Sequence, residues 1–186
     1  MRAQSRWVCV ALLTATGFLR PAGAAEAELS LAVVPQFPAL EIHRTWTPVA
    51  KAIEVSTGRA VRLKNYASIP VFERDFLADG PDLVYLNPYH MVLAHRPRGY
   101  IPLVRDNAQQ LSGILLVQAG SKITDVAQWQ GGQIAFPALN AFGASLLLRA
   151  LLADQYKVGF SANYVQTHSN ANRYVARGES VAAGGI

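Results

Sequence analysis

Cysteine is almost absent from this sequence: Cys9 is the single cysteine among 186 residues. Because Cys9 lies in an apolar N-terminal stretch, the rest of the chain can form no intramolecular disulfide and offers no thiolate as nucleophile or metal ligand. A run of lysine and arginine is also missing, although the formal net charge is +5. Nucleic-acid binders concentrate such residues in one run or on one face, so we expect no nucleic-acid partner.

A hydrophobic run long enough to cross a membrane is lacking as well. The longest apolar stretch, Trp7 to Leu19, spans 13 residues, against the roughly 20 that a membrane-spanning helix needs. It follows an arginine-containing start and precedes Ala22-Gly23-Ala24. This order is typical of a secretory signal peptide. We predict a signal peptide at residues 1–24; the alternative is an uncleaved N-terminal anchor.

From Glu28 onward, short apolar runs alternate with segments of helical period, which indicates an α/β fold. Strands are expected at 31–34, 60–63, 82–86, 101–104, 113–117, 133–136, 162–165 and 181–186. Helices are expected between them: one ending at Gly58, in which Pro48 is either the opening or a kink, one from Ser68 to Gly80, one to about Arg96, and others at 124–129, 141–153 and 170–176. The polar stretch 105–110 is interpreted as a crossover, which gives lobe 1 at 25–108 and lobe 2 at 109–186.

The loops that follow the predicted strands are the first place to look for a site, because ligands of open parallel sheets bind beyond the carboxyl ends of the strands. These loops cover 35–37, 87–90, 137–145 and 166–169, and they hold polar, small and aromatic side chains. They offer no nucleophile paired with a base and no carboxylate pair. His90 and His95 are five apart, which misses the spacing of a helical metal site. We therefore expect a binding protein rather than an enzyme, with no metal and no cofactor.

The loop before the 141–153 helix suggests an anion site. Asn140 can cap that helix, and Gly143 would let a ligand approach the backbone. A helix N-terminus presents unpaired N–H groups and partial positive charge, which suits an oxyanion. The alternative is an ordinary capped helix whose glycine packs against a strand. His168 follows the next strand and can donate to an anion or gain charge near neutrality, or it is a surface loop histidine.

Tyrosines flank another of these loops. Tyr85 and Tyr89 lie two residues on either side of Asn87, and tyrosine is a common lining of small-solute pockets because it combines rigid surface with one hydroxyl. In the alternative interpretation Tyr85 belongs to the core and Tyr89 alone is exposed.

Several motifs now occur in a fixed order: Val34-Pro35-Gln36-Phe37-Pro38, Tyr85-Leu86-Asn87-Pro88-Tyr89-His90, Ala135-Phe136-Pro137, Ala141-Phe142-Gly143-Ala144-Ser145 and Thr167-His168-Ser169. With this set the chain resembles the phosphate/phosphite/phosphonate ABC transporter substrate-binding proteins, of the type II periplasmic binding protein fold, from about Leu29 to Ile186. The resemblance implies a periplasmic, two-lobed α/β clamp that closes on a small oxyanion of the phosphate, phosphite or phosphonate class. It also implies delivery to an ABC permease in the inner membrane.

The resemblance also implies where the ligand sits. Loops of lobe 1 would contribute Gln36, Phe37, Asn87 and Tyr89, and lobe 2 would contribute Asn140, Ala141, Phe142, Gly143 and His168. A second function remains open, because the same fold serves as an extracytoplasmic ligand-sensing module of signalling proteins.

Three departures from the family pattern qualify these expectations. Asn140-Ala141-Phe142 replaces a run of hydroxyl residues, so backbone amides must carry more of the anion contact. Val181 stands where many relatives have an acid, which argues against amine-bearing phosphonates. Relatives continue for roughly another hundred residues, as two full lobes require. We therefore expect both lobes to be incomplete and the fold to be truncated in its C-terminal part.

Overall fold

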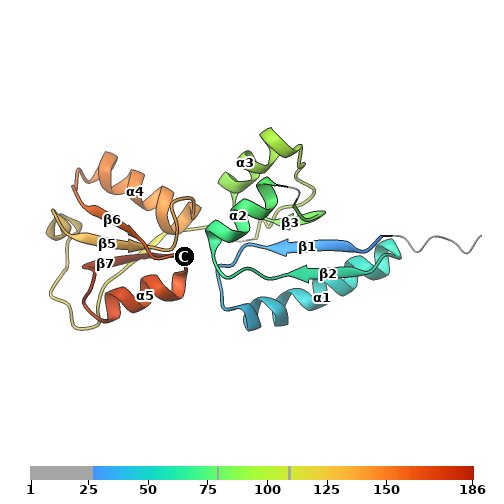
Figure 1. Ribbon diagram of the computed structural model, residues 1–186. Coiled ribbons are helices and arrows are strands. Elements are labelled where there is room, and N and C mark those ends of the chain that lie inside the picture. Colours follow the sequence, from blue (N-terminus) through green and yellow to red (C-terminus); the bar gives the residue numbers. More distant parts are fainter. Residues whose placement is uncertain (1–26, 79, 109) are drawn as a thin grey trace, which may run out of the picture.

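Two separate sheets joined by coil form the part of the chain that the computed structural model describes, residues 27–78, 80–108 and 110–186 (Figure 1). The predicted signal peptide, residues 1–24, lies outside these residues. Among the described residues, no helix is both long and apolar enough to cross a membrane.

The first sheet is parallel, with β1 (Leu29–Val33) between β2 (Val61–Lys64) and β3 (Leu83–Tyr85). Helix α1 (Ala39–Thr57) covers one face, while α2 (Ile69–Leu77) and α3 (Pro88–Arg98) cover the other (Figure 1). The core on the α2 and α3 side contains Phe72 and Phe76, both fully buried. These phenylalanines and Ile69 recur at the helical spacing that the sequence showed, so this face was predictable.

The second sheet has the order β4-β7-β5-β6, formed by Ile114–Leu116, Ala182–Gly185, Gln133–Phe136 and Ser161–Tyr164. Strand β4 is antiparallel to β7, and the other pairs are parallel. Side chains of a strand alternate between faces. Accordingly Ile134 and Phe136 pack under the long helical segment after β5, whereas Ala135 faces α5 (His168–Ala176). A short 3-10 helix, η1 (Val126–Trp129), precedes β5, and Asp125 caps it as expected.

The long helical segment after β5 begins and ends with π-helical turns, which the sequence did not predict. It consists of η2 (Phe142–Leu147), α4 (Leu148–Ala150) and η3 (Leu151–Gln155). In η2 the N–H of Leu146 donates to the carbonyl of Ala141, five residues earlier, at 3.1 Å. π turns of this kind occur frequently at functional sites.

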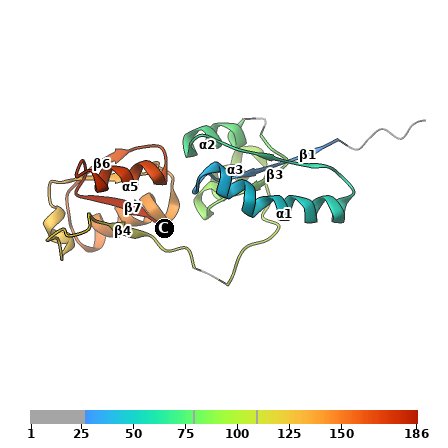
Figure 2. The same ribbon diagram turned by 90° about the horizontal axis from the view of Figure 1, so that it is seen from below.

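One local prediction was wrong. Residues 101–104 form no strand, because within the described chain no neighbouring strand pairs with them; the side chains of Ile101, Leu103 and Val104 are accordingly 67%, 72% and 92% exposed. The first helix begins at Ala39 and Pro48 lies inside it, so of the two alternatives for Pro48 the opening position is excluded. The crossover between the sheets is coil from Gly99 to Gly113 in its described part (Figure 2), and we propose that the two lobes divide within it.

Candidate functional site

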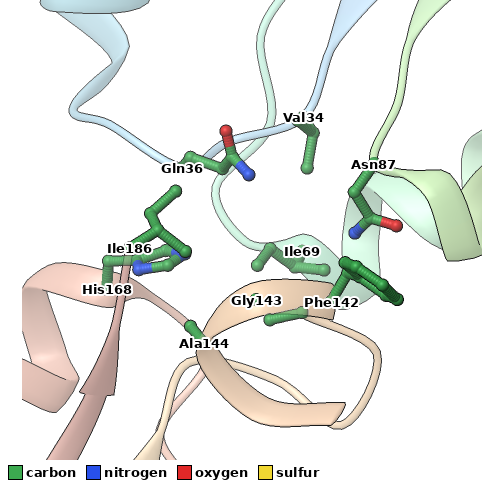
Figure 3. Close-up of a pocket in the computed structure, with 10 residues that line it drawn as sticks. Val34, Gln36, Ile69, Asn87, Phe142, Gly143, Ala144, His168 and Ile186 are labelled. Atoms are coloured by element: carbon green, nitrogen blue, oxygen red, sulfur yellow. The ribbon is translucent and has the colours of Figure 1, made fainter. Parts of the chain in front are cut away.

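Four helix N-termini converge on one small cavity between the two sheets (Figure 3). From the first sheet come Ile69, which begins α2, and Asn87, the N-cap of α3. From the second come the start of η2 and His168, the first residue of α5. Each helix N-terminus carries about half a positive charge on its unpaired N–H groups. The helix dipoles at the cavity therefore favour an anion over a cation. Its complete lining is Val34, Gln36, Ile69, Asn87, Ala141, Phe142, Gly143, Ala144, His168 and Ile186.

The start of η2 supplies free backbone donors to this cavity. The N–H of Ser145 is the first to close a helical hydrogen bond, to Ala141 at 2.8 Å. The N–H groups of Phe142, Gly143 and Ala144 precede it in the first turn and so have no intrahelical acceptor. The prediction that Asn140 caps this helix was wrong: Ala141 occupies the N-cap position and makes no side-chain cap.

Asn87 joins the two lobes at the cavity. Its side-chain Oδ1 accepts from the N–H of His90 at 2.8 Å and so caps α3. Its Nδ2 donates to the backbone carbonyl of Asn140 at 3.2 Å. Asn87 is 5% exposed. The Nδ2 amide has two hydrogens, so a ligand can accept from Asn87 either beside its contact with Asn140 or in place of it.

His168 is an uncharged donor or acceptor in this site. Thr167 caps α5 by accepting from the N–H of Asn170 at 3.1 Å, which fixes His168 in the first turn. Burial lowers the pKa of His168 to about 4, so the imidazole is neutral at pH 7. Its Nε2 is buried and has no hydrogen-bond partner among the described residues. A buried polar atom without a hydrogen-bond partner destabilises the protein. A ligand that forms a hydrogen bond with Nε2 removes this penalty, which favours binding.

We expected Gly143 to let a ligand approach the backbone, but the structure shows that packing within the protein also requires a glycine there. A Cβ at this position would lie 2.9 Å from Cγ2 of Ile186 and in contact with Leu111. The glycine thus permits packing against the end of β7, as the alternative interpretation of this loop had it. A Cβ at Gly184 would likewise collide with the carbonyl of Ala144. The backbone of β7 at Gly184 therefore packs directly against the backbone of η2 at Ala144.

The cavity has a volume of about 10 Å³, enough for one water molecule. A phosphonate is larger, so a ligand can enter only if the loops of the first sheet move away from η2. The apolar contacts between the lobes are small: Ala138, Ala141 and Ala144 share one buried cluster with Ile69 of α2. Such a contact can open at modest cost.

Six of the nine residues predicted for the site line this cavity together: Gln36, Asn87, Ala141, Phe142, Gly143 and His168. Tyr89 and Asn140 do not line it. The sequence analysis missed Val34, Ile69, Ala144 and Ile186, which are apolar and carried no chemical signal. Among the described residues, no group of three or more His, Cys, Asp or Glu side chains could hold a metal ion.

Phe37 lies instead in a second, larger hollow of about 320 Å³ on the α1 side of the first sheet. We call it the aromatic hollow; its lining is Val33, Val34, Gln36, Phe37, Glu41, Ile42, Thr45, Trp46 and Tyr85. The rings of Trp46 and Tyr85 are 4.4 Å apart at their centroids and inclined by 49°. Tyr85 is 44% exposed, so it is not the core residue of the alternative interpretation. Val34 and Gln36 border both spaces.

Comparison with known proteins gives one family and several structures. Residues 31–186 match the family described as "ABC transporter, phosphonate, periplasmic substrate-binding protein". A comparison with curated proteins gave no match.

Three solved structures share the fold at low sequence identity. PhnD1 from Prochlorococcus marinus, in complex with methylphosphonate, is 15% identical with a TM-score of 0.69; the match covers 84% of this chain and 62% of PhnD1. A binding protein component of an ABC phosphonate transporter from Pseudomonas aeruginosa is 11% identical with a TM-score of 0.67, covering 84% and 56%. The alkanesulfonate-binding protein SsuA from Xanthomonas axonopodis pv. citri, bound to MOPS, is 20% identical with a TM-score of 0.58, covering 86% and 54%.

These matches show an α/β periplasmic binding protein fold, as the sequence predicted. The chain spans about three fifths of the length of the first two proteins. The matched family is one of substrate-binding proteins, as expected for a chain that is not an enzyme.

Proposed function

Because the chain belongs to the family of periplasmic substrate-binding proteins of phosphonate ABC transporters, we propose that it binds a small oxyanion of the phosphate, phosphite or phosphonate class. In this proposal it works in the periplasm and delivers the anion to an ABC permease in the inner membrane.

The observation that carries the proposal is the convergence of helix N-termini on a cavity whose lining includes no acidic side chain among the described residues. Neither Lys, Arg, Asp nor Glu is among the described residues that line it. The first turn of η2, whose N–H groups have no intrahelical acceptor, lines the same space as Asn87 and His168, and Nε2 of His168 has no hydrogen-bond partner among the described residues (Figure 3). An oxyanion has several acceptor oxygens and favours helix N-termini. In this proposal backbone amides carry most of the contact with the anion.

Binding requires a change between two arrangements of the lobes. In the described arrangement the amide of Asn87 bonds to Asn140, and the cavity is too small for a phosphonate. In the bound arrangement the same amide turns to the anion, and the loops around Gln36 and Asn87 stand further from η2. The anion favours the bound arrangement because only in that arrangement can its oxygens accept from the donors of η2 and His168.

Titration calorimetry of the purified chain with methylphosphonate, phosphate, phosphite and sulfate, each with and without EDTA, tests the proposal. We expect one site for the phosphorus oxyanions and no effect of the chelator. Asn87→Ala should weaken binding, whereas Asn172→Ala, an exposed asparagine of α5 outside the cavity, should not. Absence of binding for all three phosphorus oxyanions, or its loss with EDTA, would contradict the proposal.

A further inference from the structure

His90 is a fully buried polar side chain that the oxyanion site does not use. Its exposed fraction is 0%, and its ring packs against those of Phe72 and Phe76, with centroid distances of 5.8 and 5.6 Å. Among the described residues, Nδ1 of His90 has no hydrogen-bond partner. A buried polar atom of this kind destabilises the fold, and an apolar side chain would pack against the two phenylalanines without that penalty. Core packing therefore does not explain the histidine.

The other ring nitrogen of His90 offers an explanation. Nε2 lies 2.8 Å from Oε1 of Glu73, whose side chain is 17% exposed. An ionised carboxylate can only accept, so Nε2 carries the hydrogen and donates it. Glu73 belongs to α2 and His90 to α3, so the bond connects two helices whose N-termini border the oxyanion cavity. Buried polar pairs can fix one geometry even where they contribute little net stability.

The first turn of α3 connects this pair to the ligand site. Oδ1 of Asn87 accepts from the backbone N–H of His90 at 2.8 Å, and Nδ2 donates to the carbonyl of Asn140 at 3.2 Å. Because the oxygen is held by His90, the direction of the Nδ2 hydrogens depends on where the first turn of α3 stands. When the lobes move apart to admit a ligand, the bond to His90 still orients the amide of Asn87.

We propose that Glu73 and His90 form a positioning pair, which holds the first turn of α3 against α2 and so keeps the amide of Asn87 aimed at the bound oxyanion. Neither of the two is among the described residues that line the cavity. The pair acts by limiting the orientations of Asn87 before the anion arrives, which reduces the entropy lost on binding. The effect on affinity rests on the proposed function, whereas the effect on the Asn87 amide does not.

A double-mutant cycle with Asn87 tests this role. Calorimetry with methylphosphonate should show that Glu73→Ala weakens binding about three- to fivefold, and by no more than Asn87→Ala does, because the pair acts through that side chain. In Glu73→Gln the amide oxygen still accepts from His90, so affinity should stay within about twofold of the parent. In the Asn87→Ala background, Glu73→Ala should change affinity by less than about twofold.

Asp75→Asn is the matched control, because Asp75 lies on the same helix but bonds to Lys64 and Tyr66. It should lower the melting temperature and leave the affinity for methylphosphonate unchanged. NMR signals of the Asn87 side-chain amide, recorded without ligand, give a second readout. They should shift in Glu73→Ala, because the N–H that holds the Asn87 oxygen moves, and they should stay in place in Asp75→Asn.

The outcomes separate this inference from the proposed function. Parent affinity in Glu73→Ala, or the same loss of affinity with and without the Asn87 side chain, overturns the positioning role and leaves the oxyanion site standing. If Glu73→Ala does not fold, Glu73→Met keeps the side-chain length without the carboxylate and takes its place with the same expectations. If the parent binds none of the phosphorus oxyanions, the proposed function fails. The Asn87 amide signals then decide the inference alone, and signals unchanged in Glu73→Ala overturn it.

Discussion

The protonation state of His168 in the bound state can be worked out from its burial. Burial lowers its pKa to about 4, so placing a proton on it at pH 7 costs about 4 kcal/mol. A charge-assisted hydrogen bond returns about 1.5 to 3 kcal/mol, which is less than this cost. We therefore expect His168 to bind the anion as a neutral donor through Nε2. The sequence analysis had allowed that it gains charge near neutrality.

Two substitutions separate a neutral donor from a charged one. His168→Gln places an amide N–H near the position of Nε2 and should bind methylphosphonate within about threefold of the parent. His168→Ala removes the donor and should lose about 1 kcal/mol, or roughly fivefold in affinity. Calorimetry at pH 7.5 in buffers of different ionisation enthalpy also counts the protons taken up on binding. Parent and His168→Gln should take up the same number.

A parent protein that takes up about one proton more than His168→Gln at pH 7.5 would refute this reasoning. The same holds if His168→Gln binds as weakly as His168→Ala while both variants melt at the parent temperature. Below about pH 5.5 the cost of charging falls to about 2 kcal/mol, and proton uptake by His168 should then appear.

Other substitutions test the packing around the site. Gly143→Ala should lower stability by about 1 to 3 kcal/mol in thermal unfolding, because its Cβ meets Ile186; an unchanged melting temperature would contradict this. Asn87→Ala should lower stability by about 1 kcal/mol as well as weaken binding, because it removes the cap of α3; stability equal to the parent would argue against the cap. Hydrogen bonds from Lys64 and Tyr66 lower the pKa of Asp75, so its contribution is present above pH 4 and is lost as pH falls below its folded pKa. The acid unfolding curve of Asp75→Asn should lack this component, and a curve of unchanged shape would count against the pairing. Val104→Thr should change stability by less than about 0.5 kcal/mol, because the side chain is 92% exposed. A larger loss would support the original prediction of a strand at residues 101–104.

The sequence predicted the elements whose signal is local. The short apolar run in Gln133–Phe136 placed β5, and Ile134, Ala135 and Phe136 are buried on both faces of the strand, as such a run predicts. We searched for a site in the loops beyond the carboxyl ends of the predicted strands, and this search led to Gln36, Asn87 and His168. The structure brings these residues to one cavity from three different loops. Parallel strand order brings Gln36 and Asn87 to one edge of the first sheet, but His168 follows a strand of the second sheet, so its approach to them depends on how the two sheets face each other.

Other features depend on contacts between distant segments, which single-sequence patterns do not contain. Residues 101–104 have the apolar character of a strand, but a strand also needs a partner for its backbone groups. The π turn of η2 comes with the close approach of Gly184, which is 40 residues from Ala144 along the chain. Trp46 and Tyr85 meet across a helix and a strand, so the aromatic hollow could not be predicted from either segment alone.

The central claim is that an oxyanion binds where the helix N-termini converge. Amide NMR spectra of the isotope-labelled chain, recorded during titration with methylphosphonate, test this location directly. The largest downfield shifts should fall on the N–H groups of Phe142, Gly143 and Ala144, with a smaller change at the side-chain amide of Asn87. Shifts confined to other parts of the chain, or a spectrum unchanged by saturating methylphosphonate, would contradict the account.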